Sequence, residues 1–243
     1  MGNEHAVEAS RVVVVDAATP TGRRIVAALE GAGAQVVPVA DQTSSPRAGE
    51  RTVDLDDLAE VRAAFAAVAE EGPIDAVVLS ALGPEPLVPQ SLLEGGPEQW
   101  ELRCERPMRV ALHVTAAAHA PLRATAGALV FLCPTVGLQG ASGYVALSGA
   151  SEGQRVLAKS AARQWAGDRI RVNILAPGMA ALLEQPPPPG SEDARRGRAP
   201  LADRADFDLD ALLLGALGFL VGGGSRLLSG TTVVADGLQV MAL

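Results

Sequence analysis

One stretch, residues 129–178, limits what this chain can fold into more than any other. An apolar run over residues 128–133 predicts a fully buried strand that ends at a proline. A glycine-rich turn and a long helix rich in Ala, Leu and Val (about 144–165) follow, and a second apolar run (170–175) ends in Ala-Pro-Gly. A strand, a helix and a second buried strand in this order are typical of a parallel sheet with helices packed on it.

The same alternation runs along the whole chain. It predicts an α/β fold with a doubly wound parallel sheet, in one domain that spans residues 11–243. Residues 1–10 are polar and are expected to be flexible, and residues 184–208, proline-rich and then polar, are expected to form a variable lobe or surface loop. The further strands are expected at 12–15, 35–40, 74–79 and 229–237, and the further helices at 22–32, 57–71, 100–123 and 209–220.

Composition narrows the function classes. The net charge is −8 with no basic cluster, which argues against binding to nucleic acid or to an anionic membrane. Hydrophobic residues make up 48% of the chain and aromatic residues only 3%, so the core is expected to be aliphatic. Cys104 and Cys133 form no disulfide framework, and no run has the length of a membrane span or a secretion signal. A cytoplasmic protein is therefore expected.

Two segments resemble one enzyme family. The run V-N-x-x-A-P-G at residues 172–178 and the run S-G-x-x-x-x-A-D-G at residues 229–237 are similar to those of the short-chain dehydrogenase/reductase family. The resemblance covers about residues 11–237 and implies a Rossmann-like sheet, an NAD(P) cofactor and hydride transfer to a carbonyl. It also implies a catalytic set of Ser, Tyr, Lys and Asn.

Each of the four catalytic positions that the resemblance implies carries another residue here. Leu147 stands in place of the acid/base Tyr and Ser151 in place of the Lys, while Pro134 and Pro107 stand in place of the Ser and the Asn. Hydride transfer needs a proton donor at the developing alkoxide, and leucine has no proton to donate. The only tyrosine and the only lysine, at 144 and 159, lie more than about 20 Å apart along one helix. We therefore expect no catalytic residue of the ordinary redox kind.

The turn after the first strand departs from the family pattern as well. Family members carry T-G-x-x-x-G-x-G, whose glycines let the backbone approach the cofactor's pyrophosphate. Here Gly22 aligns with the last glycine, Ala17 replaces the first, and Asp16 adds a carboxylate close to where phosphates would lie. The turn is expected to hold no cofactor. The alternative is a variant phosphate loop that uses Thr19, Thr21, Arg23 or Arg24.

Two acidic residues are weak candidates for the adenosine end of a cofactor. Asp41 follows the second strand, where an acidic residue would bind a ribose hydroxyl and favour NAD over NADP. Asp54 either edges an adenine pocket or belongs to the start of a helix. We expect no cofactor in this chain, with NAD as the alternative. No metal site is expected, because His113 and His119 are not on one helix face and lack acidic or Cys companions.

Three functions remain open from the sequence. The first is a non-catalytic subunit that forms a hetero-dimer or hetero-tetramer with an active short-chain dehydrogenase, through the 100–123 and 144–165 helices or the 209–237 edge. Such a complex would act on an acyl-CoA or a similar hydroxy/keto substrate. The second is a non-redox cyclase, dehydratase or isomerase on the same fold, and the third is a regulator that senses a dinucleotide. The polar residues available to the second function are Tyr144, Ser148, Ser151 and His113.

Overall fold

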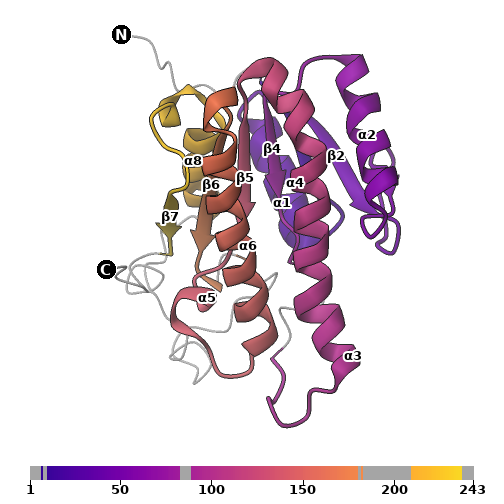
Figure 1. Cartoon of the computed structure of the whole chain (residues 1–243), viewed down its shortest axis with the longest axis vertical. Helices are drawn as coiled ribbons and strands as arrows, with labels where there is room; N and C mark the ends of the chain where they lie inside the picture. The colour runs from indigo at the N-terminus through magenta and orange to yellow at the C-terminus, as the bar shows by residue number, and fades with distance from the viewer. Residues whose placement is uncertain (1–6, 8–9, 83–88, 180–181, 183–208, 237–243) are drawn as a thin grey trace.

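The strands of the described chain form one parallel sheet in the order β3-β2-β1-β4-β5-β6-β7 (Figure 1). The structure, a computed structural model, describes residues 7, 10–82, 89–179, 182 and 209–236. The predicted doubly wound parallel sheet is confirmed. The strands are β1 (Arg11–Val15), β2 (Gln35–Asp41), β3 (Arg51–Val53), β4 (Ala76–Leu79), β5 (Ala128–Leu132), β6 (Arg171–Pro177) and β7 (Thr232–Ala235).

Helices cover both faces of the sheet and close two aliphatic cores. The main helices are α1 (Pro20–Gly31), α2 (Leu58–Glu71), α4 (Arg106–Thr125), α6 (Val145–Gln164) and α8 (Leu209–Val221). On one face α4 lies between α2 and α6, and on the other α1 packs against α8 (Figure 1). Successive strand residues point to opposite faces, so Val13 and Val15 join the first core while Val12 and Val14 join the second.

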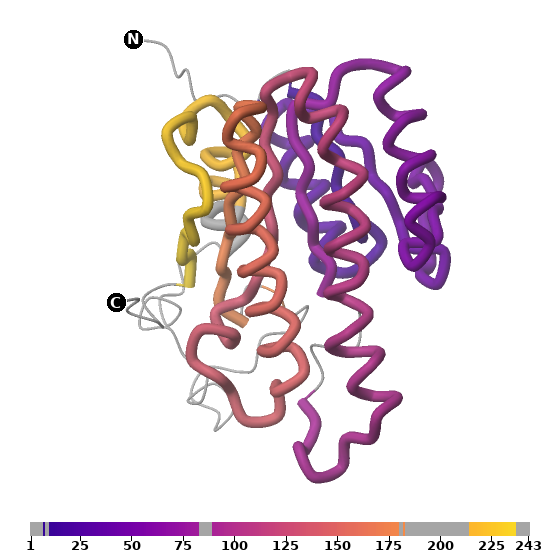
Figure 2. The backbone as a smooth tube through the Cα atoms, in the orientation of Figure 1, coloured from indigo at the N-terminus to yellow at the C-terminus, as the bar shows by residue number. Residues whose placement is uncertain are grey.

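The helical stretch of residues 97–125 is not uniform. It starts as α3 (Pro97–Trp100), continues as the π-helical segment η1 (Glu101–Glu105) and becomes regular in α4. Pro107 lies in the first turn of α4, directly after the π-helical segment. The helix expected from residue 100 onward is confirmed. It differs from the expectation in its π-helical segment, which lies just before the proline. Figure 2 shows the backbone of this stretch continuing past the end of the sheet, beside the start of α6.

The short third strand, the N-terminal stretch and the expected lobe complete the comparison of the fold with the sequence. The third strand, which the sequence pattern did not locate, is β3, and it has only three residues. Val7 lies within the polar N-terminal stretch, yet it is 4% exposed and packs in the core beside α8. Residues 184–208, the expected variable lobe, lie outside the described residues. Among the helices that the structure describes, none is long and apolar enough to cross a membrane.

Candidate functional site

The strand order reverses between β1 and β4, so the carboxyl ends of these strands are where a ligand crevice is expected. The first element at this edge is the turn from β1 to α1. Asp16 adopts a left-handed conformation (φ 63°) there. Gly22 packs so closely that a Cβ atom at this position would lie 2.3 Å from the carbonyl oxygen of Asp16. A glycine is therefore needed at position 22 because of the close contact with the turn itself, whether or not a cofactor binds there.

The polar groups of this turn bond to one another. The Thr19 hydroxyl donates to the carbonyl of Asp16 (2.8 Å) and accepts the amide N–H of Gly22 (3.1 Å), which caps α1. Pro20, the first helical residue, has no N–H to offer. Thr19 thus satisfies within the chain an amide that a phosphate-binding turn would direct at its ligand.

The N-terminus of α1 is also covered by the segment that follows β6. Thr21 donates its hydroxyl to the carbonyl of Leu182 (3.3 Å), and Leu182 and Met179 are 1% and 8% exposed. Arg23 donates to the carbonyl of Ser45 across the surface (3.0 Å). Three of the residues proposed for a variant phosphate loop (Thr19, Thr21 and Arg23) therefore bond to protein atoms.

At the end of β2, Asp41 is 3% exposed, and both of its carboxylate oxygens have partners within the chain. One carboxylate oxygen accepts the amide and the hydroxyl of Thr43 (2.8 and 2.9 Å), and the other forms an ion pair with Arg106 of α4. Arg106 also binds Asp56 (2.7 Å), which in turn binds Arg109 (2.9 Å). The oxygens that a ribose diol would need are thus bound to Thr43 and Arg106.

These contacts set the protonation states of the cluster. Burial works against the charged form of Asp56, but hydrogen bonds and the charges of Arg106 and Arg109 hold its pKa below the ordinary value. Burial likewise opposes the charged form of Arg106, and its bonds to Asp41 and Asp56 raise its pKa all the same. Asp54 lies outside this cluster, because its carboxylate accepts the amide of Asp56 (2.9 Å) within its own turn. The helix after it is capped by Asp57 instead.

The four positions that the resemblance equates with the catalytic set are buried. Leu147 and Ser151 are 2% and 0% exposed, one turn apart on α6. Pro134 follows the end of β5, and Pro107 lies at the start of α4. The Ser151 hydroxyl has no hydrogen-bond partner among the described residues. The equivalence of these positions stays a prediction.

A buried cation that the sequence patterns did not single out lies further along the same helix. Arg155 is 3% exposed and binds Glu152 (2.9 Å), the Thr232 hydroxyl (3.2 Å) and the carbonyl of Cys133 (3.4 Å). It therefore joins α6 to the end of β5 and to the start of β7. Burial raises the pKa of the Cys133 thiol to about 12, so this cysteine is a neutral packing residue. The sequence did contain a signal for this buried cation, because Arg155 recurs at the helical spacing of the apolar residues that form the buried face of α6.

A small, solvent-open pocket of about 80 Å³ lies between the 90–100 segment and the start of α6. Its lining is mainly apolar at Leu92, Trp100 and Leu147, and polar at Arg103 and Tyr144. Tyr144 is the N-cap residue of α6, whereas Lys159 is exposed fifteen residues later in the chain. The only tyrosine and the only lysine are therefore not partners.

The other polar residues considered for a non-redox site lie apart from this pocket lining. Ser148 donates its hydroxyl to the carbonyl of Val136 (3.1 Å), and Nδ1 of His113 lies 3.1 Å from the carbonyl oxygen of Leu55, beside α2. His119 contacts Asp168 (2.9 Å) and the ring of Trp165. A role for His113 in a non-redox site stays a prediction. Within the described residues no group of three His, Cys, Asp or Glu side chains is arranged to bind a metal.

Comparison with known proteins places the fold in a family. Residues 14–237 match the family model described as enoyl-(acyl carrier protein) reductase. The chain belongs to the short-chain dehydrogenase/reductase family. No curated protein matches it in sequence.

Two solved structures illustrate how well the fold of this family is retained. The Cj0485 dehydrogenase superposes with a TM-score of 0.79 at 17% identity, over 99% of this chain and 97% of that one. A short-chain dehydrogenase from Leptospira borgpetersenii serovar Hardjo-bovis, solved with bound NAD+, gives 0.78 at 15% identity, over 98% and 95%. At such identities the likeness concerns the fold alone.

One of the motifs that carry the family resemblance has a structural role that is visible here. Asn173 of β6 is 1% exposed, donates its amide to the carbonyl of Leu228 (2.9 Å) and accepts the N–H of Thr231 (3.1 Å). It fixes the connection that leads into β7. The motif thus joins the last two strands of the sheet, a role separate from any chemistry at the opposite end of β6.

Proposed function

We propose that this chain is a non-catalytic subunit of a hetero-oligomeric short-chain dehydrogenase. The observation that supports it most is Leu147, an apolar side chain in the pocket wall, at the position that the family resemblance equates with the proton donor. Ser151, one turn later, is neutral and buried, and so supplies no cation to lower the pKa of a donor. Hydride transfer to a carbonyl would lack its acid in such a pocket.

The contacts at the cofactor end support the same proposal. Thr19 and Leu182 occupy the N-terminus of α1, and Arg106 occupies the carboxylate of Asp41. A dinucleotide would have to displace all of these contacts, two of which involve buried groups. The proposed subunit therefore binds no cofactor and leaves NAD(H) to its partner.

The fold offers the proposed subunit two surfaces for assembly. One is the outer face of α4 and α6, and the other is the edge of the sheet formed by β7 together with α8, where Phe219 and Leu227 are exposed. The partner is an active member of the same family. Because the family model is named for a reductase of enoyl groups on acyl carrier protein, the substrate proposed for the complex is an acyl-CoA or a similar hydroxy/keto compound.

Two measurements test the proposal. Calorimetric titration of the pure protein with NADH and NADPH is expected to show no micromolar binding. Co-expression with an active paralogue encoded nearby is expected to give a stable complex that has dehydrogenase activity, while the pure chain has none. Micromolar binding with turnover by the pure chain would contradict the proposal, and so would failure to pair with every such paralogue.

A second candidate is a non-redox enzyme, and the position of Tyr144 in the pocket favours it. The pocket combines an apolar wall with a phenol and a guanidinium, at Tyr144 and Arg103, which suits a polyketide-like or aromatic ligand with an acidic group. Turnover of such a substrate without nicotinamide, lost in Tyr144→Phe, would support this candidate over the first. A retained rate in Tyr144→Phe would exclude Tyr144 as the acid.

A further inference from the structure

The pocket between the 90–100 segment and the start of α6 opens among exposed apolar side chains. Leu92 and Trp100 line it, yet they are 70% and 43% exposed, and Val145 on the α6 side is 40% exposed. Leu93, next to the lining, is 94% exposed. Exposed apolar side chains that gather around a hollow, with a tryptophan among them, are a common sign of a protein interaction site.

Contacts between the two walls form the pocket before anything binds in it. The amide N–H of Gln90 donates to the carbonyl of Gly143 (2.8 Å), which joins one wall to the other. A methyl group on Gly149 would lie 3.5 Å from the indole of Trp100, so this ring packs against α6. A pocket that is already formed loses little conformational freedom when a ligand enters.

The size of the pocket limits what it can take. Its volume is about 80 Å³, whereas pockets for cofactors and drug-sized ligands measure roughly 300–1,000 Å³. A substrate of the second candidate function would therefore have to widen the pocket. As it stands, the pocket suits a single bulky apolar side chain that enters from another molecule.

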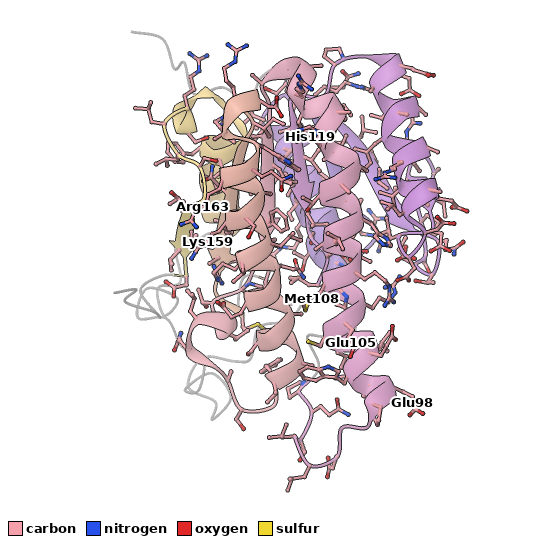
Figure 3. All side chains as sticks on the ribbon, viewed as in Figure 1. Glu98, Glu105, Met108, His119, Lys159 and Arg163 are labelled. Carbon is pink, nitrogen blue, oxygen red and sulfur yellow. The ribbon has the colours of Figure 1, made fainter. Side chains whose placement is uncertain are left out.

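The surroundings of the pocket are acidic. Residues 89–105 contain four glutamates and one arginine, and residues 134–151 contain no charged residue. Glu98 lies at the rim, because a methyl group on Gly96, which lines the pocket, would be 4.0 Å from its carboxylate. Figure 3 shows Glu98 at the end of the stretch that projects past the sheet, with Glu105 further along it.

Most of this negative charge is not neutralised within the described chain. Glu101 binds Arg109 (2.8 Å), but Glu94, Glu98 and Glu105 are exposed and form no ion pair with a residue that the structure describes. Arg103, the one basic side chain of this stretch, is half-buried in the lining. A molecule that approaches the rim therefore meets an excess of negative charge, which favours basic groups beside the pocket.

We propose that this pocket is a docking site for a basic segment of another protein, which inserts one bulky apolar side chain between Leu92 and Trp100. Lys or Arg residues on both sides of the inserted side chain contact Glu94 and Glu98. The apolar anchor supplies most of the affinity, and the charges select a basic partner over an acidic one. The site lies apart from the two assembly surfaces, and it does not depend on whether the chain is catalytic.

Tryptophan fluorescence of the full chain, titrated with three blocked peptides, tests the chemistry of the partner. The first peptide has one leucine flanked on both sides by lysines, the second has glutamates in place of the lysines, and the third has alanine in place of the leucine. Trp100 reports binding, because the other tryptophan, Trp165, is only 7% exposed. The first peptide is expected to bind with a Kd of about 1 mM or below, and at least about tenfold more tightly than the other two.

A filled pocket tests the place of binding. Gly95 lines the pocket, and a methyl group there would meet no atom closer than 3.9 Å, so Gly95→Leu is expected to fold and to fill the pocket. It is expected to weaken binding of the first peptide at least about tenfold. Gly167→Leu is the matched control, because Gly167 is exposed elsewhere and a methyl group there would meet no atom within 4 Å. Circular dichroism confirms that each variant is folded.

Charge reversal tests the role of the rim. Glu94→Lys combined with Glu98→Lys is expected to reverse the preference, so that the peptide with glutamates binds more tightly than the one with lysines. Glu30→Lys combined with Glu70→Lys, at exposed positions on other helices, changes the net charge equally and is expected to leave the preference as in the wild type.

Several results would overturn the proposal. They are a first peptide that does not bind, equal binding of the lysine and glutamate peptides to the wild type, and unchanged binding in Gly95→Leu. Sedimentation velocity of the chain alone supplies a further one. Self-association that Gly95→Leu abolishes and Gly167→Leu does not would make the occupant a second copy of this chain instead of a basic partner.

Discussion

Single residues decide what the carboxyl end of this sheet can do. Three buried side chains there, Ser80, Ser151 and Gln154, each have a polar atom with no partner among the described residues. Asn173, by contrast, is equally buried and uses both ends of its amide. A buried polar atom without a partner costs free energy, whereas a paired one stabilises the fold. The two kinds of residue should therefore respond in opposite ways to truncation.

Ser151→Ala is expected to leave the free energy of unfolding unchanged or to raise it by up to about 1 kcal/mol, because it removes a hydroxyl that lacks a partner. Asn173→Ala is expected to lower it by about 2–4 kcal/mol, because two backbone groups lose their partner. Urea unfolding monitored by circular dichroism measures both. A loss above about 1 kcal/mol in Ser151→Ala would mean that the hydroxyl has a partner, such as a buried water molecule.

Gly22 offers a second test at this scale. A methyl group there would approach the Asp16 carbonyl to 2.3 Å, so Gly22→Ala is expected to lower the free energy of unfolding by about 1–3 kcal/mol or more. A methyl group on Gly31, in the same helix, would meet no atom within 4 Å, and Gly31→Ala is expected to be neutral or slightly stabilising. Equal effects of the two substitutions would show that the turn relaxes to admit a side chain.

Among the elements, the start of α4 connects the segments at the carboxyl ends of two strands. Arg106 and Arg109 connect it to the ends of β2 and β3 through Asp41 and Asp56. The sequence predicted the strands and helices, because β-branched runs and apolar periodicity are local signals. It did not predict these ion pairs or the role of Arg155, because the partners are separated by as many as 77 residues and come together only in the fold. The short β3 and the π-helical turn before Pro107 have no distinct pattern either.

The pH dependence of stability follows from Asp56. Its pKa in the folded state lies below the ordinary value of 3.8, so the folded protein binds fewer protons than the unfolded chain as the pH falls through this range. The stabilisation is therefore complete above about pH 4 to 5 and is lost as the pH falls below 3.8 toward the folded pKa. The difference in unfolding free energy between the wild type and Asp56→Asn is expected to shrink over that range, and to be smaller in high salt. A difference that stays constant from about pH 7 to about pH 3 would exclude Asp56 as its source.

At the scale of the whole molecule, the chain keeps the family's sheet while its two outer surfaces differ in character. The α4/α6 face is apolar at its centre, where Met108, Leu112 and Val156 are exposed. The opposite edge ends in β7, whose outward N–H and C=O groups have no neighbouring strand in the described chain. Next to it, Phe219 and Leu227 expose further apolar surface.

The last prediction concerns that edge. If the β7/α8 edge binds the active paralogue, Leu227→Glu is expected to weaken capture of the paralogue in a co-purification experiment by about tenfold or more, because it places a charge in an apolar contact. Val156→Glu, on the α4/α6 face, is the matched control and is expected to leave capture intact. The masses of the purified complexes, measured by light scattering, show whether the paralogue is bound to each variant. If Val156→Glu instead abolishes capture and Leu227→Glu does not, the paralogue occupies the α4/α6 face, and the assignment of the two surfaces is reversed.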